Sequence, residues 1–76
     1  RPVVRGIAIS LADQAVDRIV AYFDEQDRLA AAAGGAALTA EDRARIKAQV
    51  IEPLRDALRR DALRLADEWL DKVVER

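Results

Sequence analysis

The chain contains neither cysteine nor histidine among its 76 residues. Without cysteine it can form no disulfide, and without both residue types it cannot build an ordinary zinc site. The same absence removes the bases and thiolates on which serine and cysteine hydrolases depend. The hydroxyl side chains are Ser10, Thr39 and Tyr22, and the first two stand where helix caps are expected. We therefore predict no enzyme activity and no cofactor.

Aromatic residues and unbalanced charge are also scarce, with one Trp, one Tyr, one Phe and a net charge of −1. Recognition of nucleic acid uses basic surface and stacking aromatics, so we expect no nucleic-acid partner. No apolar run approaches the roughly 20 residues that cross a bilayer, and no secretory signal is visible. We expect a cytoplasmic protein without a membrane segment.

Helix-favouring residues are abundant. The hydrophobic fraction is 51%, but 16 of these residues are Ala. Alanine favours helix strongly and contributes little buried area. A chain of this length makes one domain. The composition predicts a single all-α domain over residues 1–76, with long helices and a thin core.

The first predicted helix spans about residues 11–33, because apolar residues recur there at three- and four-residue spacing. Gly34-Gly35 follows as a left-handed cap, and residues 34–38 form the loop between helices. Residues 1–10 leave two possibilities open. Their β-branched residues and alternating pattern favour a short strand, whereas Pro2 suits the first position of a longer helix.

The second predicted helix spans about residues 40–75. Thr39, with Asp42 three residues later, has the pattern of a capping box at its start. Pro53 lies inside this helix, and proline removes an amide donor and clashes with the preceding turn, so we predict a kink near it. The apolar residues follow steps of three, four and four, which favours a nearly straight bundle over a left-handed coiled coil.

The second helix also carries a second apolar line on another face, and one neighbouring helix cannot cover both. Two helices alone can cover each other on one side only and do not enclose a hydrophobic core. The sequence therefore predicts a long helical hairpin that forms an antiparallel four-helix bundle with a second copy, or docks on a helical partner protein. The residues predicted to form this interface are Ile19, Phe23, Leu54, Leu58, Leu65 and Trp69.

Residues 9–19, ISLADQAVDRI, provide an alternative, because they resemble the strand-to-helix entry of ribbon–helix–helix repressors and antitoxins. The resemblance implies a dimer whose N-terminal strands enter the DNA major groove. Ala8 and Ser10 would then stand at the base-reading positions, with Arg5 on the other face. Direct readout uses Arg, Lys, Asn or Gln, and the side chains of Ala8 and Ser10 are small.

Pairs of carboxylates suggest a second alternative, a metal-dependent helical hydrolase. Asp24 and Asp27 lie three residues apart, as do Glu68 and Asp71. This spacing resembles that of all-helical nucleotide pyrophosphatases, and carboxylate oxygens suit Mg²⁺ and Mn²⁺. The remainder of that acidic motif is absent, so we expect solvated faces and no metal site. The leading prediction is a non-enzymatic interaction module.

Overall fold

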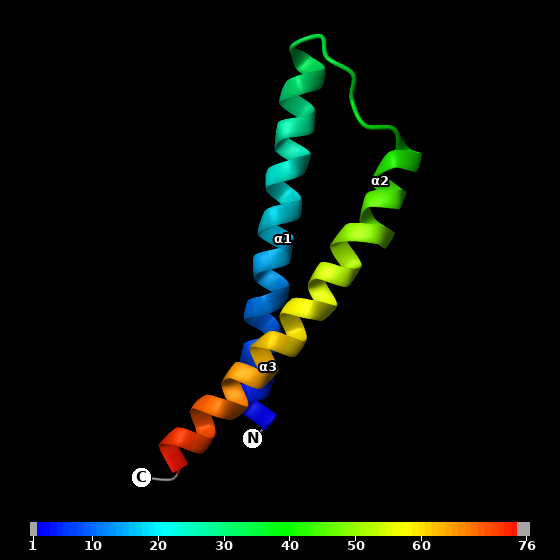
Figure 1. Cartoon of the computed structure of the whole chain (residues 1–76). Helices are drawn as coiled ribbons and strands as arrows, with labels where there is room; N and C mark the ends of the chain where they lie inside the picture. Colours follow the sequence, from blue (N-terminus) through cyan, green and yellow to red (C-terminus); the bar gives the residue numbers. More distant parts are fainter. Residues whose placement is uncertain (1, 75–76) are drawn as a thin grey trace.

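The computed structural model describes residues 2–74, which form one long helical hairpin (Figure 1). Helix α1 spans Pro2–Ala32 and α2 spans Ala40–Ile46; a π-helix, η1, spans Lys47–Ile51, and α3 spans Glu52–Val74. No strand occurs among these residues. The all-α prediction and the hairpin are confirmed, while the predicted helix end at residue 75 lies outside the described residues.

The first helix begins much earlier than residue 11, so the predicted start was wrong and the helical extension is the correct alternative. Pro2 occupies the first position of α1, where its missing amide costs nothing. The β-branched residues of this segment therefore do not make it a strand, and Arg5 lies 3.8 Å from Asp67 across the two helices. Ser10 is internal to the helix, and its hydroxyl accepts a hydrogen bond from Gln14.

The turn between the helices forms as the sequence predicts. Gly34 has φ +87°, a left-handed conformation that glycine adopts without steric cost. The amide of Gly35 donates to the carbonyl of Ala30 at 2.9 Å and satisfies one of the last helical acceptors. At the start of α2, the Thr39 hydroxyl accepts from the Asp42 amide at 3.0 Å, and the Asp42 carboxylate accepts from the Thr39 amide. The capping box is confirmed.

The proline is accommodated by the π-helical turn that precedes it. The amide of Glu52 donates to the carbonyl of Lys47, five residues back, instead of to the fourth. Pro53 has no amide to donate, and in a regular helix its ring would clash with the carbonyl four residues back. The hydrogen-bonding pattern changes in the turn just before it. The predicted kink near Pro53 thus takes the form of a π turn within a continuous helical rod (Figure 1).

The π turn also changes which residues share a face. In an uninterrupted α-helix, Ile46 and Leu54 would lie about 80° apart, from 100° per residue. The π turn inserts one extra residue, which rotates the preceding segment by about 100° relative to the following one. Ile46, Val50 and Leu54 therefore fall close to one line along the rod.

The packed core is very small. Among the described residues, the buried side chains are Ala12 and Val16, both on the face of α1 that meets α3. The molecule measures 59 × 20 × 15 Å. A helix with its side chains is about 10–12 Å wide, so these dimensions correspond to a single layer of two helices. No second layer covers either face of that layer in the single chain.

Candidate helix-docking surface

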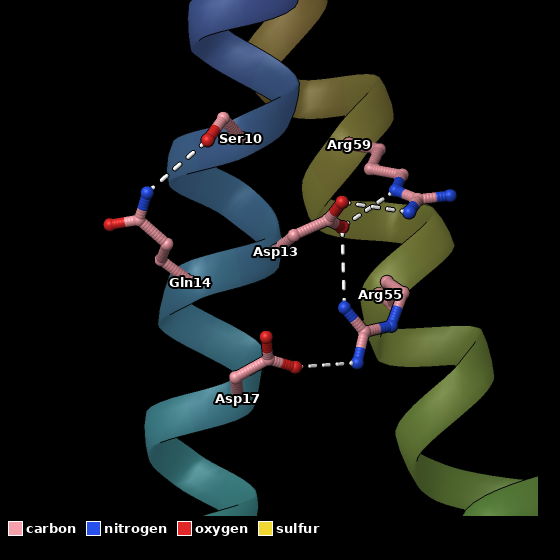
Figure 2. Close-up of polar contacts among 6 residues, drawn as sticks. All are labelled: Ser10, Asp13, Gln14, Asp17, Arg55 and Arg59. Atoms are coloured by element: carbon pink, nitrogen blue, oxygen red, sulfur yellow. Dashed lines mark hydrogen bonds and ion pairs between the residues drawn. The ribbon is translucent and has the colours of Figure 1, made fainter.

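An ionic cluster joins α1 to α3 where the two helices cross (Figure 2). The Asp13 carboxylate accepts two hydrogen bonds from Arg59, at 2.7 and 2.8 Å, and one from Arg55 at 3.3 Å. Arg55 also donates to Asp17 at 2.9 Å. The Arg59 guanidinium, with help from Arg55, holds the pKa of Asp13 below its ordinary value, although partial burial opposes this shift.

A second ionic cluster closes the hairpin near its turn. Arg43 of α2 donates to Asp24 at 2.9 Å and also to Asp27. Asp27 is largely covered, and its other oxygen accepts the backbone amide of Leu38 at 3.0 Å. The first pair of carboxylates proposed as metal ligands is thus occupied by a guanidinium.

The second pair of carboxylates gives no metal site in the described residues either. Glu68 lies 3.5 Å from Arg64 on the same helix. Across residues 2–74, no three carboxylates come close enough together to hold a metal ion. The arrangement offers ion pairs between helices and no ligand set of the kind that Mg²⁺ or Mn²⁺ uses.

Between the two clusters, α1 diverges from α2 and η1 (Figure 1) and leaves an open cavity of about 900 Å³, which we call the wedge. Phe23 from α1 and Val50 from η1 are 62% and 56% exposed there. The large apolar side chains that line the wedge are Val20, Phe23, Leu38, Ile46, Val50 and Ile51. Apolar surfaces of this kind, open to water and flanked by charged groups, are typical of protein–protein interfaces and of ligand-binding grooves.

The opposite end of the molecule exposes a second apolar surface. Arg5, near the start of α1, lies 3.8 Å from Asp67 of α3, and the C-terminal end of α3 extends beyond the start of α1 (Figure 1). Leu65, Trp69 and Val73 recur every four residues there and are all exposed, Trp69 to 59%. We call residues 65–73 the α3 end. Its line of Leu65, Trp69 and Val73 stays exposed in the single chain, although Leu70 is half-buried and Asp67 pairs with Arg5.

Three of the six predicted interface residues belong to these two surfaces. Phe23 lines the wedge, and Leu65 and Trp69 belong to the α3 end. Leu54 and Leu58 lie half-buried on α3 between them, and Ile19 is exposed on α1. A single chain does not bring the six residues into one patch.

Sequence reasoning missed two residues of the wedge, Ile46 and Val50. In a regular helix Ile46 would lie about 80° from Leu54, and the π turn brings it close to that line. Val50 is four residues before Leu54 and lies about 40° from it even without the π turn. The presence of Pro53 was the available signal, since a proline inside a helix is one cause of altered bonding in the preceding turn. A further exposed line, missed as well, consists of Val3, Ile7 and Leu11 on α1.

Comparisons with protein-family models, characterised proteins and solved structures found no significant match to this chain. Within residues 2–74, no helix combines the length and the apolar content needed to cross a bilayer. The resemblance to ribbon–helix–helix proteins depends on an N-terminal strand, and residues 2–10 are helical. Ala8 and Ser10 therefore lie on a helix and not on the strand that the predicted base-reading positions require.

Proposed function

We propose that this chain is a non-enzymatic assembly module, which buries its exposed apolar surfaces against helices of another protein chain, in the first place a second copy of itself. The observation that carries the proposal is the amount of apolar side chain left uncovered. Fourteen large apolar side chains in the described residues are exposed, against two small or medium-sized ones that are buried. Single exposed apolar residues are normal, but continuous lines of them at both ends of a molecule mark interaction surfaces.

The exposed area supports the same proposal. The chain exposes 5980 Å², whereas a compact monomer of its 8.4 kDa mass exposes about 4,600 Å². Its radius of gyration is 17.1 Å, against about 11 Å for a compact domain of this length. The excess of about 1,400 Å² per chain would give a dimer interface of roughly 2,000–2,800 Å² in total, the size range of permanent homodimers.

The balance of folding energies also favours a partner. Ordering each backbone residue costs about 1–2 kcal/mol, and small domains without disulfides or metals offset this cost with difficulty. Among residues 2–74 only Ala12 and Val16 are buried. The ion pairs between the helices are part-buried at Asp13 and Arg55 and exposed at Asp17, and exposed pairs contribute about 0–1 kcal/mol each. Burial against a second hairpin would supply the missing apolar contacts.

Sedimentation velocity and urea unfolding, each over about a hundredfold range of protein concentration, test the proposal. We expect a dimer or a higher oligomer, with an unfolding midpoint that rises with concentration because association stabilises only the folded chain. A chain that stays monomeric and unfolds with a midpoint independent of concentration would contradict self-association. A monomer that acquires stability only with a helical protein partner would assign the surface to that partner instead.

A further inference from the structure

We infer that the wedge of one copy receives the α3 end of a second copy, and that the second copy's wedge receives the first copy's α3 end. The two hairpins then lie antiparallel about a two-fold axis. This inference rests on the proposed self-association and specifies which surfaces meet. Each chain supplies one acceptor, lined by Phe23 and Val50, and one donor, which carries Trp69.

The donor fits the acceptor in length and chemistry. The α3 end holds nine residues, about 13 Å of helix at 1.5 Å per residue. The wall of the wedge from Arg43 to Arg55 is about 18 Å long by the same measure. The wedge is apolar in its centre and ends at ionic clusters on both sides, and the donor offers an apolar line led by Trp69. Tryptophan is the residue type most often found as an anchor at the centre of an interface.

The positions of the two surfaces require a reciprocal arrangement. The wedge lies beside the turn and the α3 end lies at the other end of a molecule 59 Å long, so no chain can fill its own wedge (Figure 1). A head-to-tail contact would leave one wedge and one donor free in every dimer, and would produce an open filament or, where the rotation closes, a larger ring. An antiparallel two-fold pair satisfies both wedges and both donors in one closed dimer.

The same geometry explains the apolar line between the two surfaces. The centre of the wedge on η1, near residue 48, and Trp69 are about 32 Å apart along the rod. The two-fold axis must pass midway between them, beside Leu58. Leu54 and Leu58 lie within about 60° of Leu65 and Trp69 around α3, from 100° per residue, so they would lie on the side of α3 that faces the second copy. These are also the half-buried members of the predicted interface.

Cross-linking between copies tests this register directly, because the natural chain has no cysteine. Lys47→Cys places a thiol at the wedge and Glu68→Cys places one beside Trp69, both at exposed positions. One variant is isotopically labelled, the two are mixed, and a short bismaleimide is added. We expect a cross-linked product with the mass of one chain of each kind. Like positions are roughly 30 Å apart in the proposed dimer, so either variant alone should cross-link at least tenfold less.

A matched control uses Ser10→Cys, also exposed on the described chain but outside both surfaces, mixed with Glu68→Cys. A wild-type dimer in which the 47–68 product is no stronger than this control would overturn the inference and leave the proposed function standing. A wild-type chain that is monomeric at every concentration would overturn both. The two failures are therefore distinguishable by sedimentation of the wild-type protein.

Complementation gives an independent test. Val50→Glu places a charge in the wedge, and Trp69→Glu places one on the donor; both positions are exposed in the single chain, so its fold does not depend on them. Either change is present twice in a homodimer, and we expect each to weaken dimerisation by about 100-fold or more. A mixture of the two variants contains one intact wedge-and-donor contact per heterodimer and should associate more tightly than either variant alone. Variants that each dimerise like the wild type would overturn the inference.

Discussion

Replacement of the one fully buried valine tests whether α1 and α3 pack as the structure describes. Val16 is 0% exposed, whereas Val3 on the same helix is 74% exposed. Val16→Ala and Val3→Ala remove the same two methyl groups and introduce the same residue into the same helix. Any difference between their effects therefore reports the environment of the side chain rather than its chemistry.

The expected magnitudes follow from that environment. Two buried methyl groups contribute about 1.6 kcal/mol of transfer free energy, and the cavity left behind adds up to about 1 kcal/mol. Alanine has a higher helix propensity than valine, which stabilises the helix by about 0.5 kcal/mol at either position. We expect Val16→Ala to lower the free energy of unfolding by about 1.5–2 kcal/mol, and Val3→Ala to leave it unchanged or raise it slightly.

Urea unfolding followed by circular dichroism, with both variants at the same protein concentration, measures these differences. A loss of this size would lower the melting temperature of a domain of this length by roughly 6–16 °C. If Val16→Ala costs no more than Val3→Ala, the contact between α1 and α3 at Val16 does not exist in solution, and the crossing of the two helices is refuted.

Four further substitutions have defined outcomes. The pKa of Asp13 in the folded chain lies below its ordinary value of 3.8. The stability that Asp13 contributes is therefore present above pH 3.8 and is lost as pH falls through the folded pKa. Asp13→Asn should remove this part of the acid dependence of the melting temperature. Gly6→Ala, at an open helical position, should stabilise the chain by about 0.5–1 kcal/mol, whereas Gly34→Ala, at positive φ, should destabilise it by about 1–2 kcal/mol in urea unfolding. Thr39→Ala should cost about 1 kcal/mol through loss of the cap, and an unchanged thermal melting curve would contradict the capping box.

The helical hairpin itself could be read from local sequence signals. The glycine pair, the Thr39 cap and the apolar spacing act over a few residues, and short-range interactions of this kind depend little on the rest of the chain. The conformation of residues 2–10 could not be decided in this way. Their local preferences pointed to both strand and helix, and the contact between Arg5 and Asp67, distant in sequence, accompanies the helical outcome.

The candidate surface was predicted only in part. Phe23, Leu65 and Trp69 could be recognised as members of an apolar line, because helical periodicity places them on one side of their helices. Their exposure, and the distance between the wedge and the α3 end, depend on where the two helices cross. That crossing is set by contacts such as those of Asp13 with Arg55 and Arg59, which join residues more than forty positions apart.

The sequence by itself determined the all-helical class, the turn and the capping box, since these depend on interactions between residues close together in the chain. Composition and periodicity also predicted more apolar surface than two helices can bury. Tertiary structure alone decided where that surface lies. The π turn before Pro53 rotates Ile46 onto the line of Val50 and Leu54, and the divergence of α1 from η1 opens the wedge beside them. Pro53 was a local signal for an altered turn, but a pattern that assumes regular helices does not predict the resulting rotation. The divergence depends on how the two helices meet, about which such a pattern carries no information.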